Sequence, residues 1–124
     1  MGNGGNTLTG GNGRRNLLIA GSSASTLLGG DDEDILIGGT TAYDMDVASL
    51  MAIMDYWSGT SDHYATRVGN LLAGKGVPLL DATTVTSNGG VNMLTGQLGL
   101  NLYYGKVTDN TDFDPNSGAV FILV

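Results

Sequence analysis

The sequence predicts a mainly β fold: a parallel β-roll, or β-solenoid, of nonapeptide repeats interrupted by a two-helix insertion. Glycine-rich segments recur about every nine residues, and each carries an apolar residue two positions after a small polar one. From about Thr41 the apolar spacing changes to that of helices. A fixed period of this kind is typical of stacked repeats, and the 124 residues provide one domain with a modest core.

Repeated units occupy the beginning of the chain and return after a break. They are MGNGGNTLT, GGNGRRNLLI with one extra residue, AGSSASTLL, GGDDEDILI, SNGGVNMLT and GQLGLNLYY. Their polar and apolar positions are Asn6 and Leu8, Asn16 and Leu18, Ser25 and Leu27, Asp34 and Leu36, Asn92 and Leu94, and Asn101 and Tyr103. Glycine permits the tight turn of each unit, and the apolar residue is the inward-facing centre of a short strand. One unit cannot bury that side chain alone, so we expect stacked coils with their leucines in two columns.

Residues 1–124 are expected to form one domain in four parts. N-terminal repeats occupy residues 1–40, a helical insertion 41–76, returning strands and repeats 77–113, and a C-terminal capping strand 114–124. The last part ends in GAVFILV, an apolar run that can close the open end of the roll. A C-terminal secretion signal is the alternative interpretation of this tail.

The first predicted helix of the insertion is amphipathic. Residues at helical spacing form its apolar face: Val47, Leu50, Met51, Met54 and Trp57. Asp44 and Asp46 precede it, where negative charge favours the helix dipole, and Gly59 follows its end.

The second predicted helix has a shorter apolar face, formed by Tyr64, Val68, Leu71 and Leu72. Ser61 is its candidate cap, and Gly74 ends it. Both helices are expected to pack their apolar faces on the roll. A ligand groove lined by the aromatic and methionine side chains is the alternative.

Charge and composition exclude several classes of function. The net charge of −7 and the isoelectric point near 4.1 argue against nucleic acid as a partner, because phosphate binding needs a basic surface. The chain has no cysteine, so disulfides and thiolate metal sites are excluded. No apolar run reaches the length of a membrane span, and the segment MGNGGNTLTGG does not have the pattern of a secretory signal.

The repeats resemble the haemolysin-type calcium-binding nonapeptide of the RTX family, whose ideal unit is G-G-x-G-x-D-x-U-x. The segments LLIAG, ILIGGTTAYD, LMAIMDYWSGTSDHYATRVGNLL and NMLTGQLGLNLYYG are similar to helix-interrupted C-terminal repeat modules of large planctomycete surface proteins. The resemblance extends to about Lys106. It implies an extracellular or cell-surface location, export by type I secretion, and calcium held between coils by aspartates of the turns.

The sixth position of each unit departs from the family, which has aspartate there. It is occupied by Asn6, Asn16, Ser25, Asp34, Asn92 and Asn101. Alternate units meet across a site, so Asn6 is expected to lie against Ser25, and Asn16 against Asp34. Neither pair has two carboxylates, whereas calcium prefers several anionic oxygen ligands. We therefore expect a weak or degenerate calcium site at most, formed by Asp31, Asp32, Asp34 and Asn16, and no other cofactor.

Two arginines lie one coil away from the acidic segment DDED. Guanidinium groups pair well with carboxylates. The hypothesis is that Arg14 and Arg15 supply the positive charge that calcium would supply in an ideal repeat. The alternative is that both side chains extend into solvent, where ion pairs contribute little.

The sequence does not favour an enzyme. His63 is the only histidine, and a nucleophilic triad or a zinc site needs further groups in a defined geometry. His63 is expected to be an exposed helix residue.

These observations predict a non-enzymatic, extracellular structural or adhesive module. One alternative is a calcium-dependent folding or secretion module of a surface protein. Another is a self-assembling filament subunit, because the open edges of a solenoid invite end-to-end stacking into a homo-oligomer.

Overall fold

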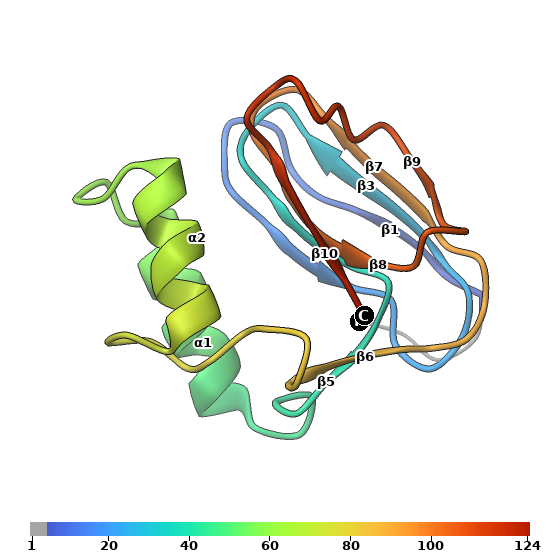
Figure 1. Cartoon of the computed structure of the whole chain (residues 1–124), viewed down its shortest axis with the longest axis horizontal. Coiled ribbons are helices and arrows are strands. Elements are labelled where there is room, and N and C mark those ends of the chain that lie inside the picture. The colour runs from blue at the N-terminus through green and yellow to red at the C-terminus, as the bar shows by residue number, and fades with distance from the viewer. Residues whose placement is uncertain (1–4) are drawn as a thin grey trace.

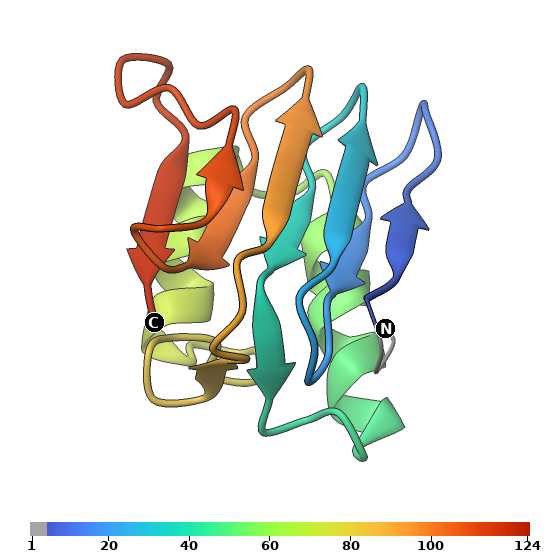
Figure 2. The same cartoon turned by 90° about the vertical axis from the view of Figure 1, so that its right-hand side faces the viewer.

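The computed structural model describes residues 5–124 and shows a mainly β chain with two helices and parallel sheets (Figure 1). The first parallel sheet contains β1 (Thr7–Thr9), β3 (Thr26–Gly30), β7 (Met93–Gln97) and β9 (Asn110–Thr111), in that order. The second contains β2 (Leu17–Ile19), β4 (Ile35–Ile37), β8 (Leu102–Gly105) and β10 (Val120–Leu123). Consecutive strands of these two sheets alternate between them, so the chain passes back and forth from one to the other (Figure 2).

The predicted leucine columns are confirmed. Leu8 lies opposite Leu27 in the first sheet, and Leu18 lies opposite Leu36 in the second. Leu94 and Tyr103 extend the two columns by one strand in each sheet. All six side chains belong to one apolar cluster, which fills the space between the two sheets.

The second sheet is buried on both faces. Its strands read LLI, ILI and LYYG, whereas β1 of the first sheet reads TLT and buries only its middle residue, partly. The apolar residues that do not face the first sheet pack against the helices; they include Ile19, Ile35, Ile37, Leu102 and Tyr104. The helices therefore form a third layer outside the second sheet, and the first sheet keeps its outer face open (Figure 1).

The first helix lies within the predicted insertion and ends at Gly59, as predicted. α1 (Val47–Ser58) begins after Asp46, whose carboxylate accepts from the Ser49 N–H at 3.2 Å, and it ends at Gly59. Its predicted apolar face is wrong in part. Met51 is 60% exposed and Val47 also faces solvent, whereas Ile53 and Trp57 are fully buried. Leu50 and Met54 are partly buried.

The second helix is α2 (Tyr64–Ala73). Its buried residues are Tyr64, Arg67, Val68 and Leu71. Ser61 is not its cap, because the helix begins two residues later than that assignment requires, after His63, which makes no capping side-chain bond. Gly74 ends the helix in the left-handed conformation, as predicted. Within the described residues, neither helix is long and apolar enough to cross a membrane.

A small antiparallel sheet joins the insertion to the rest of the chain. It consists of β5 (Gly39–Thr41) and β6 (Val85–Ser87). A Cβ atom on Gly39 would overlap the Thr86 carbonyl, so this close strand approach requires glycine.

Leu27→Ala tests the inner column. Leu27 is fully buried, and its truncation should lower the free energy of unfolding by about 3 kcal/mol, because a cavity remains in a thin core. Urea denaturation measures the change. Leu98→Ala is the matched control, since Leu98 is 68% exposed and should change stability by no more than about 0.5 kcal/mol. Equal effects of the two changes would contradict a core at this position.

Candidate functional site

Four turns lie next to one another where the first sheet passes to the second, at the top of Figure 2. We call this set the first edge; its turns are residues 10–16, 31–34, 98–101 and 112–119. The opposite set, the second edge, carries the turns 20–25, 88–92 and 106–109. All predicted metal ligands lie on the first edge.

A hydrogen-bond ladder connects the turns of the first edge. The Asn16 N–H donates to Asp34 Oδ1 at 2.7 Å, and the Asp34 N–H donates to Asn101 Oδ1 at 2.8 Å. Each of these main-chain N–H groups at the sixth position thus binds the sixth-position side chain that precedes the neighbouring strand of the sheet. The predicted pairing of Asn16 with Asp34 is confirmed.

The second edge has the same ladder. The Asn6 N–H donates to Ser25 Oγ at 3.2 Å, and the Ser25 N–H donates to Asn92 Oδ1 at 3.0 Å. The Asn92 N–H then donates to Asp109 Oδ1 at 2.8 Å. The pairing of Asn6 with Ser25 is confirmed, and Asp109 extends the ladder beyond the six units identified in the sequence.

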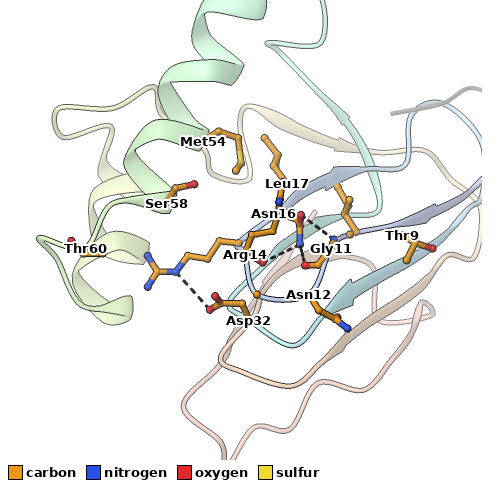
Figure 3. A pocket seen from close by; sticks show the side chains of 14 residues that line it. Thr9, Gly11, Asn12, Arg14, Asn16, Leu17, Asp32, Met54, Ser58 and Thr60 are labelled. Atoms are coloured by element: carbon orange, nitrogen blue, oxygen red, sulfur yellow. Dashed lines mark hydrogen bonds and ion pairs between the residues drawn. The ribbon is translucent and has the colours of Figure 1, made fainter.

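The side-chain amide of Asn16 lies among four oxygen atoms. Its nitrogen contacts the carbonyls of Gly11, Arg14 and Gly29 at 3.1–3.2 Å, and Asp34 Oδ1 at 2.9 Å. Figure 3 shows this amide directed back into its own turn. An amide has only two N–H bonds, so these contacts are shared, and the partial positive charge of the NH₂ group offsets the partial negative charge of the surrounding oxygens.

The four predicted metal ligands do not all converge. Asn16 and Asp34 are in contact, whereas Asp31 accepts from the Gly13 N–H at 2.7 Å and Asp32 accepts from the Glu33 N–H at 2.8 Å. Among residues 5–124, no three His, Cys, Asp or Glu side chains gather closely enough to hold a metal ion.

Asp34 is fully buried and keeps one oxygen, Oδ2, without a hydrogen-bond partner within the described part of the chain. The pKa of its carboxyl is raised from 3.8 to about 6, mainly because the group is buried and in smaller part because Asp32 and Asp31 are negatively charged. The hydrogen bonds from Asn16 oppose this shift by lowering the pKa. Gly29 allows this arrangement, because a Cβ atom there would collide with Oδ2.

The two arginines behave differently. Arg15 lies 3.3 Å from Glu33 and 3.9 Å from Asp32, and its Nη1 donates to the carbonyls of Trp57 and Gly59. The hypothesis of arginine pairing with the acidic segment is therefore confirmed for Arg15. Arg14 is exposed and has no acidic partner among residues 5–124.

Arg67 is a buried cation that the sequence analysis did not identify. Its guanidinium donates to the Glu33 carboxylate and lies 4.4 Å from the centre of the Trp57 ring, over its face. Trp57 in turn donates from Nε1 to the Glu33 carbonyl at 2.8 Å. Glu33 thus binds Arg15 of the turn 10–16 and Arg67 of α2 together, which connects both helices to the first edge.

An open cleft of about 950 Å³ lies beside this cluster (Figure 3). Residues 9–18 form most of its wall, with Asp32, Met54, Ser58 and Thr60 opposite. His63 does not line the cleft; it is exposed and directly precedes α2.

Comparison with known proteins gave no relative: no protein-family model, no curated protein and no solved structure matches the chain.

Asp34→Asn should remove a pH dependence of stability. Because the folded-state pKa of Asp34 is about 6 and its ordinary value is 3.8, the folded protein keeps a proton that the unfolded chain has lost. The free energy of unfolding should therefore fall as the pH rises from about 4 through 6, by at most about 3 kcal/mol. Asparagine stays neutral, so the variant should lose this fall and be the more stable protein at pH 8.

The measurement is thermal denaturation of both proteins from pH 4 to pH 8. Asp55→Asn, an exposed carboxylate of α1, is the control and should keep the wild-type profile. Identical profiles for wild type and Asp34→Asn would show that Asp34 is ionised in the folded state.

Arg67→Met tests the buried cation. The change keeps most of the side-chain volume but leaves Glu33 with Arg15 alone, so stability should fall by about 2–3 kcal/mol in urea denaturation. Arg14→Met is the matched control, since Arg14 is exposed and its loss should cost less than about 0.5 kcal/mol. Similar losses for the two variants would refute a special role for Arg67.

Proposed function

We propose that the chain is a non-enzymatic structural or adhesive module of an extracellular or cell-surface protein, built as an RTX-like β-roll that folds without calcium. The observation that carries this proposal is the position of the Asn16 amide nitrogen, among the oxygens of its turn and of Asp34. A hydrogen-bond donor lies there where an RTX-like repeat would use a cation.

The strand order supports the roll. Four strands of each parallel sheet pair in constant register, with the sixth-position residues directly before β2, β4 and β8. Alternation of the chain between the two sheets makes each pair of strands one coil, which is the arrangement that a nonapeptide period predicts.

Two further asparagines support the replacement of calcium by amide groups. Asn92 Nδ2 donates to the Gly38 carbonyl at 3.1 Å, and Asn101 Nδ2 donates to the Leu98 and Gly99 carbonyls at 3.3 Å. Calcium binds six to eight oxygens, several of them carboxylate oxygens. The paired side chains at Asn16 and Asp34 offer one carboxylate, so this donor set fits an amide better than a calcium ion.

A calcium-dependent module remains the second candidate, and one observation favours it. Asp34 Oδ2 is buried and has no partner among the described residues, and a cation beside it would supply one. In that case calcium would neutralise the Asp34 carboxylate and would be coordinated by carbonyl oxygens of the neighbouring turns.

The open cleft supports a binding or structural role rather than catalysis. Its wall consists mainly of one glycine-rich turn, and its carboxylate, Asp32, is held by an ion pair with Arg15. A general acid or base must instead be free to exchange a proton with a substrate.

Calcium and chelator experiments separate the two candidates. We expect wild type to have the same far-ultraviolet circular dichroism and the same melting temperature in EDTA and in millimolar calcium. Asn16→Asp should behave differently, because a second carboxylate next to Asp34 is repelled by it until a cation binds. This variant should lose several degrees of melting temperature in EDTA and regain them in calcium.

Asn12→Asp is the control, since it adds the same charge to an exposed position of the same turn and should respond to neither reagent. Unfolding of wild type by EDTA, or a gain of several degrees in calcium, would support the calcium-dependent module instead.

A further inference from the structure

The stack of strands has two different ends, one formed by β1 and β2 and the other by β9 and β10. Within residues 5–124, β2 pairs only with β4 at one end of the second sheet, and β10 pairs only with β8 at the other. The first sheet likewise begins with β1 and ends with β9. An unpaired strand edge presents free N–H and C=O groups to any strand that can match them.

The free groups of the two ends are complementary. At β2, Asn16 O accepts from the Ile35 N–H and the Ala20 N–H donates to Ile37 O. Alternation along a parallel strand then directs the main-chain groups of Leu17 and Ile19 outward.

At β10, the Val124 N–H donates to Gly105 O. The same alternation directs the main-chain groups of Phe121 and Leu123 outward. The bonds between β4 and β8 join residues that are one position out of register: the Leu102 N–H donates to Asp34 O, and the Gly38 N–H donates to Tyr104 O. The outward groups of β10 and β2 are offset from each other in the same way. A β10 strand from a second copy therefore extends β2 without any change of register.

This register is set by the pairing inside the chain. Val120 is in the column of Leu102, Ile35 and Leu17, and Ile122 is in the column of Tyr104, Ile37 and Ile19. In a stack, Val120 and Ile122 of one copy would lie beside Leu17 and Ile19 of the next.

An apolar groove is present at this position. It has a volume of about 260 Å³ and is lined by Leu17, Ile19, Leu50, Met51 and Met54. Met51 is 60% exposed although it lies directly over the open edge of β2. Val120 and Ile122 belong to the same helix-facing cluster as Leu17 and Ile19, so their side chains are on the side of the sheet that this groove covers.

The charges of the terminal turns also match. Stacking places the last turn of the first edge, residues 112–119, beside the first turn, 10–16, at about 4.8 Å, the spacing of neighbouring strands. Exposed Asp112 and Asp114 lie in the last turn, and exposed Arg14, which has no acidic partner among the described residues, lies in the first.

The helices have room in such a stack. Four strands span about 19 Å at their usual spacing, and two packed helices span about 16–20 Å. The two helices lie side by side behind the sheets in Figure 2, so α1 of one copy would follow α2 of its neighbour along the stack.

From these observations we propose that the chain binds a second copy of itself head to tail, with β10 and the acidic last turn of one copy seated on β2, the Met51 groove and Arg14 of the next. The contact joins two different surfaces and leaves one of each free, so it continues into filaments instead of closing. The inference rests on the strand pairing and the charges, and it holds whether or not calcium binds.

Two end-blocked variants test the proposal. Met51→Lys places a charge in the groove at the β2 end. Leu123→Pro removes an outward N–H at the β10 end, and it breaks no bond inside the chain because that N–H points away from β8. Wild type should show a sedimentation coefficient that rises with concentration, and each variant alone should stay monomeric. An equimolar mixture of the variants should form a one-to-one dimer, because each supplies the end that the other lacks.

The matched controls are Leu98→Lys, at an exposed position away from the terminal strands, and Leu123→Ala, which keeps the N–H. Both should associate like wild type. A monomeric wild type at all concentrations, a mixture that stays monomeric, or a closed dimer that both variants retain would each overturn the proposal.

Charge reversal tests the terminal turns. Arg14→Asp or Asp114→Arg alone should weaken association at least about tenfold, because like charges then meet across the contact. The double variant should regain the wild-type affinity, and added salt should weaken wild-type association. Failure of the double variant to recover would remove Arg14 and Asp114 from the contact.

Discussion

One repeated contact aligns neighbouring strands of the two parallel sheets: a main-chain N–H at the sixth position of a unit donates to the side-chain oxygen at the same position of the next unit in the sheet. It occurs from Asn16 to Asp34 to Asn101 on the first edge, and from Ser25 to Asn92 on the second. The contact satisfies a main-chain donor at the point where the chain turns into a strand, and it fixes the register of that strand on its neighbour. The acceptor in each of these contacts is a side-chain oxygen of the protein itself. At Asp34 this contact uses Oδ1, and the buried Oδ2 has no hydrogen-bond partner among residues 5–124.

The two helices and the second sheet bury apolar side chains against each other. The second sheet has apolar residues on both faces, so it cannot be exposed to water on its outer side, and α1 and α2 cover it. Glu33 holds the helices at one place through Arg67, Arg15 and the Trp57 indole. The apolar triplets LLI and ILI, compared with TLT, were a usable sequence signal for which sheet the helices cover.

Much of the stack could be predicted from the sequence because every unit repeats the same local pattern. The leucine columns follow from the nine-residue spacing, the pairs of sixth-position residues from the pairing of alternate units, and the end of α1 from Gly59. Spacing did not reveal which side of α1 faces the sheet, where Ile53 is buried and Met51 is exposed. It also missed Arg67, since a charged residue on an apolar face becomes buried only through a partner, Glu33, 34 positions away. Of the predicted site, Asn16 and Asp34 meet, but the turn geometry directs Asp31 and Asp32 to other groups.

Amide hydrogen exchange measured by nuclear magnetic resonance in EDTA tests the ladder most directly. The account predicts that the main-chain amides of Asn16, Ser25, Asp34 and Asn92 are protected to the same degree as those of the central strand residues Leu36 and Leu94. Each of these four N–H groups donates to a side-chain oxygen of the next coil, so it exchanges only when the coils separate. Exchange of the four amides as fast as that of the exposed turn residue Asn12, with protection gained only after calcium is added, would contradict it.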